Sequence, residues 1–166
     1  HPLSVDTYID QTLSGAKGTL IRLIGGVQYW EYGLNQVYKL AQEKGIALAV
    51  LPADGREDTR LDEYSTIPKS TLQRLKKLTD TGGSKAAAAA LAQLAIAAGL
   101  YAAPIIGDKS LPEVGYWSLE KGVVSEFVSS KNNQVVSIIF YRSFLASEDM
   151  AAVERLSDAF ILLGYQ

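Results

Sequence analysis

The first half of the chain alternates short apolar runs with amphipathic stretches. Residues 19–24 form a nearly continuous apolar run that Arg22 alone interrupts, and the run ends at Gly25-Gly26. A second apolar run covers residues 46–51 and is closed by a proline. Runs of this kind, rich in β-branched residues, are typical of strands buried on both faces. We therefore predict two buried strands.

Between the two runs, apolar residues recur with helical spacing. They fall at i, i+4, i+7, i+8 and i+11 and form one stripe: Trp30, Leu34, Val37, Tyr38 and Ala41. Gly45 stands where a helix commonly ends. Strand, helix and strand in close succession predict a βαβ unit with parallel strands and a right-handed crossover.

The rest of the chain predicts more helices and one more strand. Residues 53–66 are polar and predict a loop, and 135–141 predict the third strand. Further helices are expected over 5–16 and over the alanine-rich stretch up to Gly99. Another is expected from Pro68 to Gly82-Gly83, with Leu72, Leu75 and Leu78 inward. A last helix is expected after an N-cap at Ser147, and its inward residues are Val153, Leu156, Phe160 and Leu163.

These elements predict an α/β fold with an open, mainly parallel sheet and flanking helices, of the flavodoxin-like or Rossmann-like kind. A helix without a preceding strand at the start, and a helix without a following strand at the end, indicate that residues 1–166 are a fragment of a larger protein. Residues 101–134 are the hardest to interpret and could contain a domain boundary.

The composition excludes several kinds of chemistry. The chain has 166 residues, a net charge of −2, no cysteine and a single histidine, His1. Disulfides, thiolate metal sites, a Ser–His–Asp triad and a two-histidine zinc motif are therefore not expected. A pI near 5.4 argues against nucleic-acid binding by charge neutralisation. The uncharged stretch 86–106 is long enough for a membrane span, but its alanine content favours a packed helix.

Ligands of open parallel sheets bind beyond the carboxyl ends of the strands. Three stretches are expected to converge there: Gly25, Gly26, Gln28, Tyr29 and Trp30 after the first strand; Pro52, Asp54 and Arg56 after the second; and Tyr141, Arg142 and Ser143 after the third. A glycine pair before a helix would leave backbone N–H groups open to a carboxylate or phosphate. The same pair is equally what a tight strand-to-helix turn requires.

Each candidate side chain has a structural alternative. Arg22 lies in a predicted buried run, where its guanidinium would need a bound anion or a paired carboxylate. The structural alternative is that its stem packs while its guanidinium reaches a neighbouring acid or solvent. Tyr29 could offer a flat face to a macrocycle, whereas Trp30 and Tyr32 are more typical of a core. The acids Asp54, Glu57, Asp58, Asp62 and Glu63 lack calcium-loop spacing and predict a solvated loop, and Arg74, Lys76 and Lys77 predict a solvated helix face.

No nucleotide-binding fingerprint is complete. The glycine that follows Gly25-Gly26 is Gly33, so the three-glycine dinucleotide pattern fails. Residues 107–110 are similar to the end of a phosphate-binding loop, but Asp108 interrupts the pattern. ATP binding by this chain is not predicted. A phosphotransfer receiver domain is also excluded, because glycines stand where its acidic residues would follow the first strand.

Ordered blocks of the chain resemble the CobN/magnesium-chelatase H-subunit family. The most specific block is 22–34, and the likeness continues through 45–52, 54–56, Leu61, 65–68, 82–83 and 135–142. It spans roughly residues 5–164. Ala53 stands where the family usually has glycine, and alanines follow Gly83 where the family tends to have asparagine.

The resemblance implies an N-terminal piece of the large, tetrapyrrole-binding subunit of a cytoplasmic, ATP-dependent cobaltochelatase. Such an enzyme inserts Co²⁺ into a corrin precursor in cobalamin biosynthesis, with ATP and Mg²⁺ used by AAA+ partner subunits. The family's metal-handling residues match no motif here, so no catalytic residue is carried over and the piece is expected to be inactive alone. The alternatives are a magnesium-chelatase H-type subunit acting on a porphyrin, or a non-enzymatic α/β ligand-binding or interaction domain.

Overall fold

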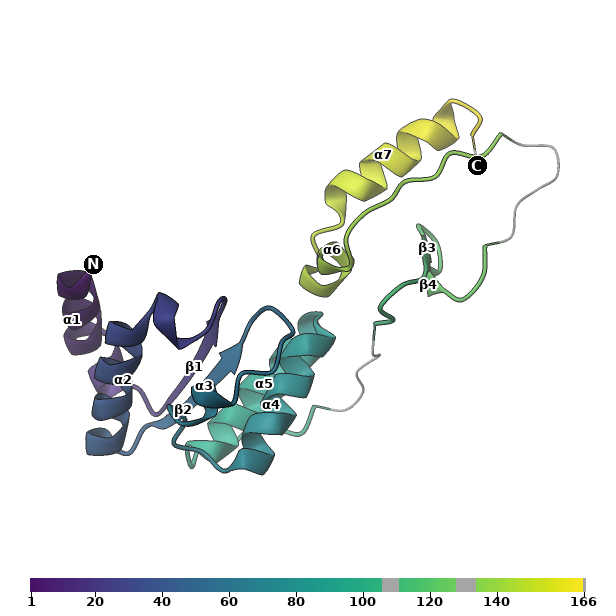
Figure 1. Ribbon diagram of the computed structural model, residues 1–166. Coiled ribbons are helices and arrows are strands. Elements are labelled where there is room, and N and C mark those ends of the chain that lie inside the picture. Colours follow the sequence, from purple (N-terminus) through teal and green to yellow (C-terminus); the bar gives the residue numbers. More distant parts are fainter. Residues whose placement is uncertain (106–110, 128–133, 166) are drawn as a thin grey trace. The chain divides into compact units, whose positions relative to one another are not determined.

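The computed structural model describes residues 1–105, 111–127 and 134–165. The chain forms two compact units, one made of His1–Asp80 with Lys85–Gly107 and the other of Thr81–Ser84 with Asp108–Gln166. The helices and strands up to α5 belong to the first unit, apart from the turn 81–84 (Figure 1).

The first unit contains both strands that the apolar runs predicted. In order along the chain, its elements are α1 (Pro2–Gln11), the 3-10 turn η1 (Leu13–Gly15), β1 (Gly18–Leu23), the 3-10 turn η2 (Val27–Tyr29), α2 (Glu31–Lys44), β2 (Ala47–Pro52), α3 (Thr59–Asp62), α4 (Lys69–Thr81) and α5 (Ser84–Ala97). Strands β1 and β2 are parallel, in register from Gly18 opposite Ala47 to Leu23 opposite Pro52. The predicted βαβ unit and the α/β class are confirmed, with a small parallel sheet flanked by helices.

Burial differs between the two strands. All six residues of β2 are buried, as predicted, whereas β1 is half-buried and Arg22 is exposed. Among the described residues β1 pairs with β2 alone, so it lies at the margin of the sheet. The prediction that β1 is buried on both faces is therefore wrong, because the described elements cover its side chains only partly and leave Arg22 exposed.

Strand β2 separates two apolar layers because successive side chains of a strand point to opposite faces. Leu48 and Val50 pack on one side with residues of α1, α2 and α3, which include Ile9, Leu34, Val37, Ala41 and Leu61. Ala49 and Leu51 pack on the other side with residues of α4 and α5, which are Leu72, Leu75, Ala90 and Leu94. The predicted inward residues of these helices are largely confirmed, and Gly45 ends α2 in the left-handed conformation.

The outer edge of β2 is closed by two hydroxyl side chains. Leu48 N donates to Thr66 Oγ1 at 2.8 Å, and Val50 N donates to Ser65 Oγ at 3.0 Å. Thr66 Oγ1 in turn donates to the carbonyl of Ile46 at 2.7 Å. These bonds replace those that a neighbouring strand would make.

The second unit differs more from prediction. Its elements are the antiparallel hairpin of β3 (Tyr116–Ser118) and β4 (Gly122–Val124), then α6 (Arg142–Ser147) and α7 (Ala151–Leu162). The predicted third strand at 135–141 is not formed within the described residues, since no described strand pairs with this segment. Ser147 ends α6, where its Oγ donates to the carbonyl of Ser143 at 2.8 Å, so it is not the N-cap of α7. The sequence did not predict the hairpin.

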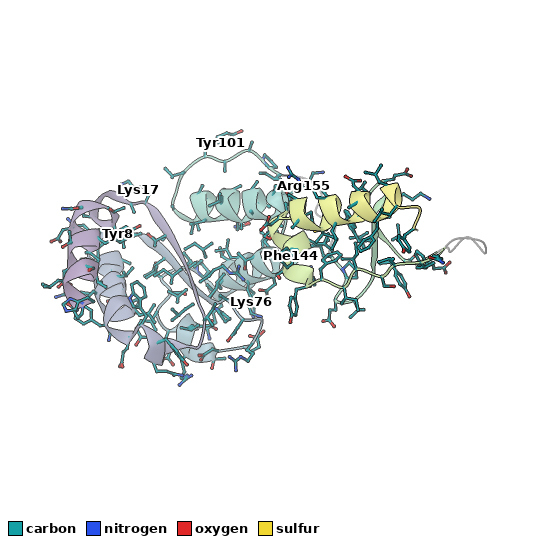
Figure 2. The ribbon with its side chains drawn as sticks, turned by 90° about the horizontal axis from the view of Figure 1, so that it is seen from above. Tyr8, Lys17, Lys76, Tyr101, Phe144 and Arg155 are labelled. Atoms are coloured by element: carbon teal, nitrogen blue, oxygen red, sulfur yellow. The ribbon has the colours of Figure 1, made fainter. Side chains whose placement is uncertain are left out.

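Tyr101, which follows α5, is 92% exposed (Figure 2). None of the described helices is long and apolar enough to cross a membrane.

Candidate functional site

A cavity of about 250 Å³ lies where the carboxyl ends of β1 and β2 meet. It is lined by Gly25, Gly26, Gln28, Pro52, Asp54, Arg56, Glu57, Asp58, Arg60 and Leu61. The structure therefore brings together the first two of the three expected stretches. All of these residues belong to the first unit.

The glycine pair forms a turn that only glycine accommodates without strain. Gly25 and Gly26 have φ of 88° and 84°. A Cβ at Gly25 would also lie 2.5 Å from Cε2 of Tyr29, so the tyrosine ring covers this glycine closely. The turn leads into η2, and α2 begins only at Glu31, after a break at Trp30 (φ −149°, ψ 36°). The helix entrance expected at residues 28–30 is thus found, but η2 and Trp30 separate the glycine pair from the N-terminus of α2.

A carboxylate of the chain itself lies against the glycine turn. A Cβ at Gly26 would lie 2.8 Å from Asp58 Oδ2. Asp58 is also the N-cap of α3, because its Oδ1 accepts from Arg60 N at 3.2 Å and from Arg60 Nε at 3.1 Å. The hydrogen bond from the Arg60 side chain is the main reason why the pKa of Asp58 is lowered. The place expected to hold a ligand anion thus already has a negative charge beside it.

A second aspartate of the cavity is paired in the same way. Asp54 Oδ2 accepts from Arg56 Nη2 at 2.6 Å and from Arg56 Nε at 3.0 Å, and this side-chain bonding lowers the pKa of Asp54. Each of these two aspartates thus pairs with the arginine two residues later. The Asp-x-Arg spacing, repeated at 54–56 and 58–60, is the sequence signal that would have identified Asp58 and Arg60 as cavity residues.

Two exposed side chains near the cavity are an aromatic ring and a guanidinium. Tyr29, whose ring lies against Gly25, is 74% exposed, and the side chain of the lining residue Arg56 is 77% exposed. Their neighbours play structural roles. Trp30 packs against the core cluster of α1 and α2, and Tyr32 Oη donates to Asp6 Oδ1 at 2.8 Å, which raises the pKa of Tyr32.

Arg22 reaches an acid, which was the structural alternative for this residue. Its Nη2 lies 3.7 Å from Oδ1 of Asp80 on α4. Lys76 Nζ lies 3.6 Å from Asp80 Oδ2 and donates to Glu57 Oε1 at 2.6 Å. The bond to Glu57 is the main reason why the pKa of Lys76 is raised. A row of four charges therefore connects β1 to the cavity, and Lys76, predicted as part of a solvated helix face, is part of that row.

The third expected stretch does not join this site by the predicted route. Arg142 begins α6 in the second unit, where its Nε donates to the carbonyl of Pro112 at 3.1 Å and its Nη2 to that of Leu111 at 3.2 Å. Residues 135–141 form no strand with β1 or β2, so the strand that was expected to carry Arg142 to the sheet crevice is missing from the described residues. Residues 107–110 lie outside the described residues.

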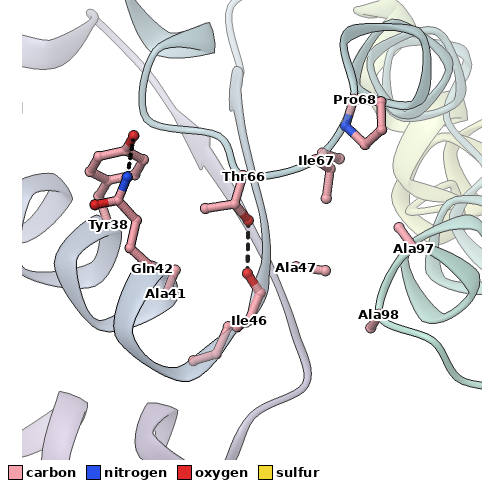
Figure 3. Close-up of a pocket in the computed structure, with 11 residues that line it drawn as sticks. Tyr38, Ala41, Gln42, Ile46, Ala47, Thr66, Ile67, Pro68, Ala97 and Ala98 are labelled. Atoms are coloured by element: carbon pink, nitrogen blue, oxygen red, sulfur yellow. Dashed lines mark hydrogen bonds between the residues drawn. The ribbon is translucent and has the colours of Figure 1, made fainter.

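A second cavity, of about 590 Å³, lies at the opposite, amino end of β2 (Figure 3). Its walls come from the end of α2, residues 66–68 and the end of α5. The polar side chains in it bond within the chain: Thr66 Oγ1 donates to the Ile46 carbonyl, and Gln42 Nε2 donates to Tyr38 Oη at 2.8 Å. The sequence analysis did not predict this cavity, since its walls come together only in the tertiary structure.

No family model matches the chain. Among curated proteins, the aerobic cobaltochelatase subunit CobN of Sinorhizobium sp is 34% identical over 178 aligned positions, which cover 96% of this chain. The chain is homologous to part of CobN. It spans 13% of the length of that relative. CobN of Pseudomonas aeruginosa is 36% identical over 80 positions, or 48% of this chain.

A solved structure shares the fold. The catalytic subunit of cobaltochelatase from Mycobacterium tuberculosis superposes with a TM-score of 0.67 at 20% identity, covering 97% of this chain and 13% of that protein. The likeness to CobN predicted from the motif blocks is thus confirmed in both sequence and fold.

Proposed function

We propose that this chain is part of the tetrapyrrole-binding large subunit of an ATP-dependent cobaltochelatase that inserts Co²⁺ into a corrin precursor in cobalamin biosynthesis. The observation that carries the proposal is the 34% identity to CobN along 96% of the chain. In this proposal, AAA+ partner subunits use ATP and Mg²⁺, and the complex works in the cytoplasm.

The proposed role of this chain is to bind and position, not to insert the metal. Within residues 1–105, 111–127 and 134–165, no group of three His, Asp or Glu side chains is placed to hold a metal ion. The acids of the cavity are instead paired with cations: Asp54 with Arg56, Asp58 with Arg60 and Glu57 with Lys76. We therefore assign cobalt insertion to the rest of the subunit and expect these 166 residues to be inactive alone.

The cavity at the ends of β1 and β2 is the proposed contact with the macrocycle. A carboxylated tetrapyrrole has a flat ring and peripheral carboxylates, which suit the exposed ring of Tyr29 and the guanidinium of Arg56. Because Arg56 already pairs with Asp54 at 2.6 Å, a ligand carboxylate has to share or replace that partner. We therefore expect a modest contribution from Arg56.

An absorbance titration of the complete subunit with a carboxylated corrinoid tests this contact. Arg56→Ala is expected to weaken binding by roughly fivefold at most, because solvent screens the ion pair of an exposed guanidinium. Arg74→Ala, at an exposed position of α4 outside the cavity, is the matched control and is expected to have no effect.

The outcomes separate the parts of the proposal. Equal affinity of Arg56→Ala and the unmodified subunit would exclude the cavity as the contact. No binding of any tetrapyrrole by the complete subunit would favour a non-enzymatic interaction domain. Cobalt insertion by the 166 residues alone would contradict their inactivity.

A further inference from the structure

Residues 134–141 have the burial pattern of a strand without having a partner strand. Val136, Ile138 and Phe140 are partly buried, and the alternate positions are exposed. This period of two is characteristic of extended backbone, and Figure 1 shows the segment running extended into α6. No described strand pairs with it.

One face of the segment packs within its own unit. The ring of Phe140 lies edge-on against Trp117 of β3, with centroids 6.2 Å apart and an interplanar angle of 89°. The other face, which we call the outer face, consists of Val135, Ser137, Ile139 and Tyr141. Ile139 is 94% exposed and Tyr141 is 80% exposed.

The composition of the outer face does not suit solvent. A strand with one wet face normally alternates apolar and polar residues, whereas a nearly continuous apolar run is typical of a parallel strand covered on both faces. Only Ser137 interrupts the apolar run at 135–141. The following helix shows the same excess, because α7 leaves Leu156, Ile161 and Leu162 exposed.

We propose that residues 134–141 are a strand of a parallel sheet and pair with a strand of the same longer chain that lies outside these 166 residues. Elements of that longer chain would also cover the outer face. The inference rests on the proposed function only in placing the chain within a longer subunit, as its coverage of 13% of the CobN relative supports.

A partner strand from the same chain fits the pattern better than a second copy. Two copies of the segment related by a two-fold axis would pair antiparallel, and the outer face of each would still need a cover. A continuous apolar run is instead the signature of parallel sheets. A strand in the same chain is also held at high effective concentration, so pairing requires no second molecule.

Two measurements on the complete subunit test the proposal. In the unmodified subunit, the backbone amides of 134–141 are expected to exchange with solvent at least about tenfold more slowly than amides of a segment that makes no backbone hydrogen bonds. In parallel, Ile139→Cys and Val114→Cys are alkylated with iodoacetamide and quantified by peptide mapping. Val114 belongs to the same unit and is 91% exposed, so it is the matched control.

We expect Ile139→Cys to react at least tenfold more slowly than Val114→Cys. Equal rates, or fast exchange at 134–141, would overturn the proposal. Protection that appears only at high subunit concentration would identify a second copy as the partner and overturn it as well. Neither measurement involves tetrapyrrole or cobalt, so failure here is distinguishable from failure of the proposed function.

Discussion

Replacing Gly33 by alanine tests the packing at the start of α2, because two physical effects predict opposite signs. In a helix interior, alanine is favoured over glycine by about 1 kcal/mol. In the structure, however, a Cβ at Gly33 would lie 2.0 Å from Cε2, 2.3 Å from Cζ2 and 2.5 Å from Nε1 of Trp30. Ordinary Cβ contacts lie at 3.4–4 Å, so the indole would have to move by more than about 1 Å.

The packing effect is expected to exceed the helix propensity. Trp30 packs against the core cluster that includes Leu34 and Val37, so its ring cannot move without losing contacts. Overpacking of this kind costs about 1–3 kcal/mol. After the propensity gain is subtracted, Gly33→Ala is expected to lower the free energy of unfolding by about 0–2 kcal/mol.

Urea unfolding followed by tryptophan fluorescence measures this change. The chain has two tryptophans, and Trp117→Phe as background leaves Trp30 to report on the first unit. Gly15→Ala is the matched control, since a Cβ there meets nothing within 4 Å, and it is expected to be neutral or slightly stabilising. Stabilisation by Gly33→Ala of about 1 kcal/mol would refute the placement of the indole.

Two further predictions concern the polar bonds around β2 and its loop. Thr66→Val keeps the shape of the side chain but leaves Leu48 N and the Ile46 carbonyl without the hydroxyl, so the free energy of unfolding is expected to fall by about 1–3 kcal/mol. Thr66→Ser keeps the hydroxyl and should retain most of the stability. An equal loss of stability in both variants would contradict this account. For Asp58, whose folded-state pKa is lowered mainly by Arg60, the contribution to stability is complete above the unfolded pKa of about 3.9 and is lost as pH falls through the folded pKa. An NMR titration of the Asp58 carboxyl should show its pKa rising toward the usual value in Arg60→Ala, and no change would disprove the pairing.

The candidate site could be predicted only in part. Parallel strands place their carboxyl ends at one edge, so the meeting of Gly25-Gly26 with Asp54 and Arg56 followed from the βαβ pattern. The carboxylate of Asp58 against Gly26 did not follow, because it depends on how the loop folds back over the turn. Its presence changes the chemistry of the site, since the expected anion position is bordered by a negative charge.

The predicted place of Arg142 did not follow from the sequence. Its place at the crevice depended on a third strand at 135–141 joining β1 and β2. Local composition indicated an extended segment, and the structure shows a period of two in its burial. It could not supply the pairing, because a strand exists only when another segment provides hydrogen-bond partners.

Local signals in the amino-acid sequence were sufficient to locate several elements. Apolar runs located β1 and β2, helical spacing located the stripe of α2, and Gly45 ended that helix because its left-handed conformation favours glycine. The tertiary structure alone decided which groups meet across distance, such as Trp30 over Gly33, or Thr66 on the edge of β2. The physical reason is that periodicity reports which side of an element is buried, whereas the partner on that side is chosen by the packing of the whole chain.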